Sequence, residues 1–502
     1  MSSLSKVGKW RRRLRWAVWV TLGFLILIAI GAGLTWYSLE RTAAEGKKEL
    51  AAVIAETDAL DPRWRWEEIQ EDLPPISDAE NSMRIINQAV DLLKGWNVSS
   101  FVLGNGNALH EDLEEWPPNR QLDEERLSLI RDVLKERSGA LTLAKSLKDY
   151  PRGQTVIRLS PLFLDTSLKH AQDCRLLISL LELDIERLLN EGRTKEAASD
   201  IHAVLHSGTG LRQDPFLISQ LVRMSARSHT VLRIERLLGM AENYADDLES
   251  LMAHVKAELD EDLMVVAIRG ERAGWHLHME NLESGRVSLA DFLSVGEGNK
   301  KNELDVLQRF GLFLYQPFLY EDHAFMLQQY NRTLEIAQLP DSEQPQAWYE
   351  WSSEFKATTG EAFAHKRLIL SRLMFPAVQK CAEAFLRNKA RLSCALTALA
   401  AERFRLAHKR WPKDLQELCP NYLKELPVNP ADGKAITYVR RTDGVLISSV
   451  DIGGFEEGDD TPKHSLDDDD VKGLGLRLWN PDHRRLPPEP KKKSELNDGD
   501  NR

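Results

Sequence analysis

The sequence predicts a mainly α-helical protein: an N-terminal transmembrane helix, then an irregular helical bundle or short α-solenoid, then a small C-terminal α+β hairpin module. Three observations predict this class. A long uncharged stretch lies close to the N-terminus. Apolar side chains recur at helical spacing from about residue 79 to about residue 410, and alternation typical of strands begins only at about residue 434.

The uncharged stretch runs from Trp16 to Leu39. As a helix it would be about 36 Å long, which is enough to cross a bilayer with some tilt. Tryptophan and tyrosine lie near its two ends, where amphipathic rings favour the membrane interface. We therefore predict a transmembrane helix over residues 16–39.

Charge on the two sides of this stretch predicts its orientation. Residues 1–15 carry six basic side chains and no acidic one, whereas residues 40–49 carry three of each. By the positive-inside rule, residues 1–15 form a basic cytoplasmic tail and the body lies outside. We expect a single-pass protein of the bacterial inner membrane that contacts the lipid bilayer through residues 16–39.

A cleaved signal peptide is the alternative for this segment. The apolar core of a signal peptide is usually about 7–15 residues long, and this one is longer. The small residues of RTAAEG near Ala44 nevertheless leave cleavage open. We take the retained anchor as the prediction.

The charge of the body excludes one class of partner. The chain of 502 residues has a net charge of −11, but its first 50 residues hold nine basic and three acidic side chains. The remainder holds 57 basic and 74 acidic side chains, a net charge of −17. A body of this sign argues against non-specific binding to nucleic acid.

The four cysteines form no C-x-x-C pair, so they predict neither a zinc knuckle nor a thioredoxin-type site. Cys381 and Cys394 belong to one predicted helix and would lie roughly 20 Å apart along its axis. For Cys174 and Cys419 two alternatives stay open, a disulfide between them or buried free thiols.

Residues 45–375 are predicted to form the helical body outside the membrane. They contain an α-hairpin that begins at Cys174 and whose second helix carries Ala197, Ile201 and Leu205 on its apolar face, with Gly192 suited to a left-handed C-cap between the two helices. Such hairpins build tetratricopeptide-like stacks, but no second copy follows at a fixed period. An irregular bundle or a short solenoid is therefore the prediction.

Two histidine pairs raise the question of metal binding. His202 and His206 share a helix face, but Ala203 stands where the zinc-protease motif requires glutamate. We interpret them as a half-exposed pair. His276 and His278 have no partners at ligand spacing, and we interpret them as surface residues.

Residues 376–480 are predicted to form a helix followed by a β-hairpin. The helical pattern begins at Pro376, and Trp411-Pro412 ends it because a residue before proline avoids the helical region. Trp411 is our candidate for a structural residue at the corner where the chain reverses.

The hairpin is predicted at Asp443-Gly444, which lies between alternating apolar residues. The later segment GLGLRLW also alternates and predicts a third strand. Residues 481–502 are predicted to be a disordered tail from their composition.

The patterns W-P-x-x-L-x-x-L, L-P-x-x-P-x-D-G-K-x-x-x-Y and S-x-D follow one another between Trp411 and Asp451. This order resembles the C-terminal domain of type II secretion major pseudopilins, over about 75 residues from Ala377. The resemblance implies a helix that leads through a proline loop into a small sheet. The chain departs from that family before its anchor, where GKWRRRLRW has no peptidase cut site. As a whole it resembles bacterial single-pass envelope proteins.

Pseudopilins can bind calcium in the loop that follows these strands, and the resemblance implies the same for the acidic loop DIGGFEEGDDTPKHSLDDDD. Oxygen-rich loops suit calcium, and a solvated acidic loop is the alternative. The candidate ligands are Asp451, Glu456, Glu457, Asp459 and Asp460.

The chain shows no nucleophile elbow, Walker loop or dinucleotide fingerprint. We therefore expect a membrane-anchored extracytoplasmic interaction or scaffold protein of the bacterial envelope with a protein partner, and not an enzyme. The alternatives are an accessory component of a type II secretion or pilus-like apparatus, and a hydrolase without a recognisable motif. A deep cleft with clustered buried carboxylates or histidines would favour the hydrolase, and a grooved helical surface the scaffold.

The predicted topology can be tested with a reporter that fluoresces only in the cytoplasm. Fused after Arg502, it should leave the cell dark, because the six basic residues of the tail hold the N-terminus inside. The same reporter fused before Met1 should be bright and serves as the control. Bright cells from the C-terminal fusion would refute the orientation.

Overall fold

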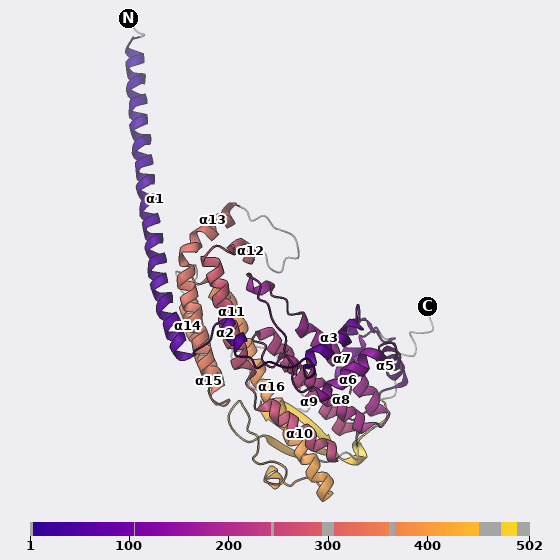
Figure 1. The fold of residues 1–502 in the computed structure, drawn as a ribbon. Helices are drawn as coiled ribbons and strands as arrows, with labels where there is room; N and C mark the ends of the chain where they lie inside the picture. Colours follow the sequence, from indigo (N-terminus) through magenta and orange to yellow (C-terminus); the bar gives the residue numbers. More distant parts are fainter. Residues whose placement is uncertain are drawn as a thin grey trace.

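The computed structural model describes residues 4–104, 106–241, 245–293, 306–360, 367–450 and 473–488. The predicted fold class is confirmed: the described chain is mainly helical, with a small three-stranded antiparallel sheet near its C-terminal end. Figure 1 shows helix α1 projecting from one end of an elongated body, with α11, α13, α14 and α15 at that end and α3 and α5–α8 at the other.

Helix α1 (Leu4–Leu60) runs without a break for 57 residues. Among the described residues it is the one helix long and apolar enough to cross a membrane, and none of its apolar window is buried inside the body. The helix does not end with the uncharged stretch at Leu39. Its last turns pack against α14 of the body, so the uncharged stretch and the first element of the body share one helix.

The helices of the body follow α1 in chain order. They are α2 (Trp66–Glu71), α3 (Ser82–Asp91), α4 (Leu109–Glu115), α5 (Glu124–Glu136), α6 (Ser138–Ser146), α7 (Lys169–Asn190), α8 (Thr194–Ser207), α9 (Leu217–Met240), α10 (Ala245–Leu259), α11 (Leu263–Glu283), α12 (Leu289–Leu293), α13 (Val306–Tyr315), α14 (Leu319–Ala337), α15 (Gln344–Gly360) and α16 (Ile369–His408).

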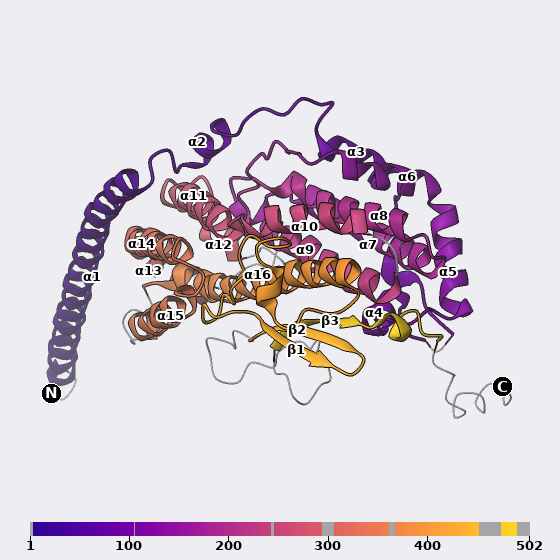
Figure 2. The ribbon, with the colours of Figure 1, turned by 90° about the horizontal axis from the view of Figure 1, so that it is seen from below.

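Helix α16 crosses the whole body and belongs to two hydrophobic cores. Its first half, including Phe375 and Phe385, packs with α11, α14 and α15. Its second half, including Leu392 and Phe404, packs with α9, α10 and the sheet. Figure 2 shows α16 running between the two ends, with the strands on one side of it and α7–α10 on the other.

The predicted α-hairpin is present as α7 and α8. Gly192 joins them with a φ of +75°, a conformation that costs glycine little. The amide of Arg193 then donates to the carbonyl of Leu188 at 2.9 Å, which satisfies one of the open carbonyls of α7. All four cysteines are free thiols, so Cys174 and Cys419 are not bridged.

The sheet has the order β1-β2-β3, with β1 (Thr437–Arg441), β2 (Gly444–Val450) and β3 (Gly473–Trp479) all antiparallel. The predicted hairpin at Asp443-Gly444 and the predicted third strand are confirmed. A Cβ at Gly444 would lie 1.9 Å from the carbonyl oxygen of Leu478, so the turn requires glycine. The Asp443 carboxylate accepts from Arg477 of β3 at 2.6 Å.

The corner after α16 is buried. Trp411 is 7% exposed, and its indole Nε1 donates to Oδ1 of Asn480 at 2.7 Å. The hydroxyl of Tyr438 on β1 donates to the carbonyl of Pro412 at 2.8 Å. These two bonds tie the end of the helix to both edges of the sheet.

The predicted start of this helix at Pro376 is wrong. Helix α16 begins at Ile369, and Pro376 lies inside it. The cause is a buried carboxylate that the sequence pattern does not reveal. Asp322 of α14 accepts from the backbone amides of Leu370 at 2.8 Å and Ser371 at 3.1 Å, which satisfies two of the open donors in the first turn.

The predicted disorder of residues 481–502 is wrong for its first part. Residues 481–488 are ordered on the body, and Arg484 is fully buried with both of its terminal nitrogens 2.9 Å from the Glu402 carboxylate. Arg485 donates to the carbonyl of Leu189 at 2.7 Å. This buried bidentate ion pair holds the segment on the body, although its composition predicts disorder.

Truncating the side chain of Trp411 should destabilise the packing of the C-terminal module on α16. Replacing a large buried aromatic side chain by alanine typically costs about 3–5 kcal/mol. We expect Trp411→Ala to speed proteolysis within residues 411–450 while α7–α9 stay resistant. Trp411→Phe keeps an aromatic ring at the corner but loses the bond to Asn480 and part of the buried surface, so it should cost less than Trp411→Ala. Equal cleavage rates for Trp411→Ala and wild type would show that the corner does not hold the module.

Candidate functional site

The end of α1 packs along α14. Leu50 and Val53 of α1 form a small core with Ala324 and Leu327 of α14, and Trp64 closes this core. The two helices meet most closely at Gly46, where a Cβ would lie 3.0 Å from the backbone nitrogen of Glu321 and 3.1 Å from the Cβ of Tyr320. A small residue at this crossing allows the two backbones to approach.

Polar contacts reinforce the same junction, which we call the anchor–body clasp (Thr57, Asp61, Arg269, Arg272 and Asn331). The Asp61 carboxylate accepts from Nε of Arg269 at 2.8 Å and also from Arg272. Asn331 Nδ2 donates to the Thr57 hydroxyl, and Arg272 donates to Asn331 Oδ1, both at 2.8 Å. Burial lowers the pKa of Arg272, and Asp61 opposes this effect. The clasp therefore fixes α1 on α11 and α14 through an ion pair with a buried guanidinium.

A pocket of about 240 Å³ lies between α1 and the segment that enters α14, on the N-terminal side of the crossing at Gly46. On the α1 side its walls come from the end of the uncharged stretch and the next turn. On the body side they come from α11, α13, the 3₁₀ turn η5 (Gln316–Phe318) and the start of α14. Its lining residues are Trp36, Leu39, Glu40, Ala43, Glu283, Phe313, Gln316, Pro317, Leu319 and Tyr320.

Behind the pocket lies a row of four side chains, which we call the polar row (Glu283, His323, His276 and Glu280). Glu283 Oε1 is 2.7 Å from His323 Nδ1, and His323 Nε2 is 2.9 Å from His276 Nδ1. His276 Nε2 then lies 3.6 Å from Glu280 Oε1. The row leads from Glu283 at the pocket wall, whose side chain is 11% exposed, to Glu280, whose side chain is 52% exposed.

Burial makes the inner part of the polar row neutral. It lowers the pKa of both His323 and His276 to about 3, and a neighbouring ring adds to the effect at His276. Burial also raises the pKa of Glu283 to about 8, although the Lys47 ammonium on α1 opposes this. Near pH 7 Glu283 therefore carries a proton, and both imidazoles are uncharged.

These protonation states define a chain of hydrogen bonds. A protonated Glu283 donates to His323 Nδ1, and the Nε2–H of His323 donates to His276 Nδ1. The Nε2 atom of His276 faces Glu280 at 3.6 Å, which is too long for a hydrogen bond. The chain of hydrogen bonds therefore runs from Glu283 to His276, and it holds one proton at the pocket wall.

The interpretation of His276 and His278 as surface residues is wrong. They are 5% and 1% exposed, because α11 lies between α14 and the rest of the body. His206 is also buried, with its Nδ1 3.0 Å from the carbonyl of Leu147, so the interpretation of His202 and His206 as a half-exposed pair fails for that residue.

Sequence reasoning missed the polar row. Its one local signal is that His276, Glu280 and Glu283 follow one another at spacings of four and three, which places them on one face of a helix. His323 comes from another helix 40 residues after Glu283, and only the packing of α14 on α11 brings it to the row.

The candidate calcium ligands Asp451, Glu456, Glu457, Asp459 and Asp460 lie outside the described residues. In the parts of the chain that the structure describes, there is no group of three or more His, Cys, Asp or Glu side chains placed to hold a metal ion. Calcium binding by the acidic loop stays a prediction.

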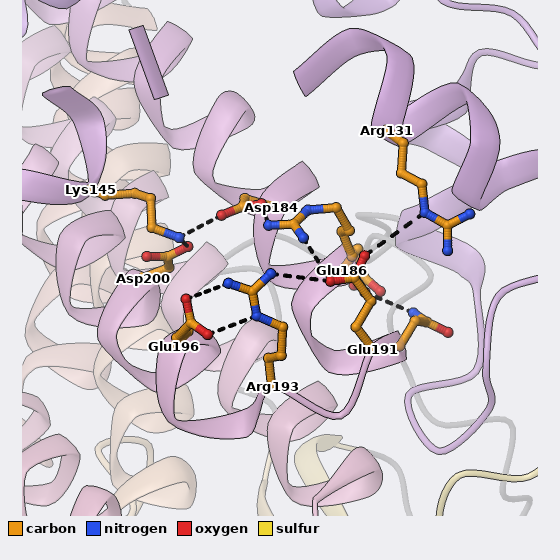
Figure 3. Close-up of polar contacts among 10 residues, drawn as sticks. Arg131, Lys145, Asp184, Glu186, Glu191, Arg193, Glu196 and Asp200 are labelled. Atoms are coloured by element: carbon orange, nitrogen blue, oxygen red, sulfur yellow. Dashed lines mark hydrogen bonds and ion pairs between the residues drawn. The ribbon is translucent and has the colours of Figure 1, made fainter. Parts of the chain in front are cut away.

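A second polar cluster lies at the far end of the body (Figure 3). Lys145 of α6 donates to Asp184 of α7 at 2.7 Å and to Asp200 of α8 at 2.9 Å. Burial raises the pKa of Asp200, whereas hydrogen bonds from Lys145 and Arg187 overcome burial and lower that of Asp184. The cluster ties three helices together, and Lys145 supplies the charge that allows two buried carboxylates to lie side by side. We interpret it as structural.

Comparisons with known proteins found no matching family model, no matching curated protein and no matching solved structure.

The protonation of Glu283 predicts a pH dependence of stability. The folded pKa of about 8 lies above the usual value of 4.5, so the folded state binds one proton more than the unfolded state between these values. Its contribution is therefore complete below about pH 4.5 and is lost as pH rises toward 8, by at most about 1.4 kcal/mol per pH unit.

Glu283→Gln keeps a neutral donor facing His323 and removes this titration. We expect the melting temperature of the variant, relative to that of wild type, to increase as pH rises from 5 to 8, because only wild type loses the contribution of a protonated Glu283. The exposed Glu56→Gln on α1 serves as the matched control and should show no such gain. Parallel pH profiles for wild type and Glu283→Gln would contradict the assignment of a protonated Glu283.

Proposed function

We propose that this chain is a membrane-anchored extracytoplasmic interaction or scaffold protein of the bacterial envelope, with its N-terminus in the cytoplasm and its helical body outside the inner membrane. The observation that carries the proposal is the unbroken α1, which leaves the uncharged stretch and enters the anchor–body clasp as one helix.

The distance between membrane and body supports this role. Gly46, where α1 meets α14 most closely, lies seven positions after Leu39, which is a rise of only about 10 Å in a helix. An enzyme that must reach dispersed substrates is served by a flexible linker. A continuous helix instead holds the body at one height and restricts its tilt, which suits a protein that presents a fixed surface to a partner.

A hydrolase is the second candidate, and one observation favours it. Glu283 lines a pocket and is hydrogen-bonded to His323, so a carboxyl group that is protonated near pH 7 has access to a cavity. A carboxyl group with a raised pKa is suited to general acid catalysis. The scaffold role remains our first proposal because the pocket wall is mainly apolar.

The arrangement of α16 and the sheet bears on the third candidate, an accessory component of a secretion or pilus-like apparatus. Helix α16 packs against β2 and β3, and Trp411-Pro412 connects helix to sheet. This is the order of elements that the resemblance to pseudopilins implies. It supports the candidate at the level of the C-terminal module alone.

A comparative pull-down from membranes tests the proposal. The full chain with a C-terminal tag is the bait, and the control carries residues 1–45 fused to an unrelated soluble domain. Cross-linked membranes are solubilised, and bound proteins are identified by mass spectrometry. We expect envelope proteins that are enriched with the full chain and absent from the control.

Two results would overturn the proposal. Recovery of the same proteins with bait and control would mean that the body binds no partner. Turnover of ester, phosphate or peptide substrates by the purified chain, lost in Glu283→Gln, would favour the hydrolase instead.

A further inference from the structure

We propose that α13 and η5 form a second membrane contact, lying in the boundary between headgroups and acyl chains on the side of the bilayer that faces the body. The inference rests on the proposed membrane anchoring by α1. It adds that the body itself touches lipid, beside the point where the anchor leaves the membrane.

The exposed side chains at this place are apolar. Phe313 and Leu314 of α13 are 53% and 38% exposed, and Leu312 and Phe318 are half-buried. The sequence of the helix, VLQRFGLFLY, contains one charged residue in ten. An apolar surface next to a polar body is typical of a contact with membrane or protein.

The height of this surface is fixed by α1. Phe313 and Pro317 line the same pocket as Trp36 and Leu39, so they stand level with the end of the uncharged stretch. Trp36 and Tyr37 are 59% and 65% exposed there, and such rings favour the membrane interface. Figure 1 shows α13 at the end of the body from which α1 projects.

Geometry then determines which partner covers the surface. If the bilayer surrounds α1 as far as Leu39, its interface reaches the level of Phe313 because both residues border one pocket. Interfacial helices bury their apolar face about 5–10 Å into this boundary. The lipid contact of α1 is thus continuous with the exposed face of α13, and no rearrangement is needed to bring lipid to it.

The polar groups of the pocket are compatible with a lipid environment. Gln316 is uncharged, and Trp36 Nε1 donates to Glu40 at 2.9 Å. Glu283 carries a proton near pH 7 and donates inward to His323, so it presents little charge to the pocket. The Glu40 carboxylate also lines the pocket, so lipid headgroups meet the pocket at Glu40 and acyl chains meet it at the apolar side chains of Phe313, Pro317 and Leu319.

Two attachment points would restrain the body more than one. A single transmembrane helix can rotate about its own axis and tilt with bilayer thickness. Contact at α13 selects one rotation of α1, the one that turns α13 and η5 toward the membrane surface. The body would then present one constant side to the surrounding space, in agreement with the scaffold role.

Site-specific photo-cross-linking of the full chain in lipid nanodiscs tests this inference. Benzoyl-phenylalanine replaces Phe313 in one variant, Trp36 in a second and the exposed Tyr349 of α15 in a third. All three are aromatic replacements at exposed positions, so the fold should be retained. After irradiation, mass spectrometry identifies whether each position carries a phospholipid or a second copy of the chain.

We expect lipid adducts at positions 36 and 313, with several-fold less at position 349. Lipid at 36 but not at 313 would overturn the inference and leave the anchor intact. No lipid at either position would overturn the anchor itself. A cross-linked dimer at 313 would mean that another copy, rather than the bilayer, covers α13.

Discussion

The fold depends on one helix with two sets of neighbours. Helix α16 is 40 residues long, so it reaches from the end of the body that holds α1 to the end that holds the sheet. Its first half completes the core around Tyr330 and Trp348, and its second half completes the core around Leu180 and Ile447. Each of the two cores therefore includes side chains of α16. The Asp322 carboxylate of α14 caps its start, and Trp411 marks its end, so both boundaries are set by contacts with other elements.

The buried ion pairs of the body serve the same purpose of fixing positions. On α9, Arg223 pairs with Glu258 of α10 at 2.9 Å, and Arg236 pairs with Glu186 of α7 at 2.8 Å. Buried pairs add little net stability over apolar packing, but breaking one leaves a charge without a partner. The anchor–body clasp follows this logic, because Arg272 is 1% exposed and depends on Asp61. A displaced α1 would therefore be strongly disfavoured, which is what the proposed rigid connection to a membrane requires.

Local patterns predicted the elements well and the contacts between distant elements poorly. The α-hairpin at Gly192, the turn at Gly444 and the third strand were all predicted, because each depends on spacing or turn chemistry within a few residues. The start of α16 was missed because Asp322 lies 47 residues before it. The order of residues 481–488 was missed because Arg484 meets Glu402 across 82 residues. The polar row was missed for the same reason, because the local sequence around a histidine does not show whether a neighbouring helix will bury it.

The polar row connects the two parts of the molecule that the proposals concern. Its members lie on α11 and α14, the helices that also hold α1 in the clasp. Trp64, which closes the small core beside α1, stacks against His276 with ring centroids 4.7 Å apart. Loss of the proton from Glu283 would place a negative charge at the pocket wall and turn the hydrogen bond to His323 around. The row and the clasp thus share two helices, so the proton on Glu283 lies within the packing that holds α1 against the body.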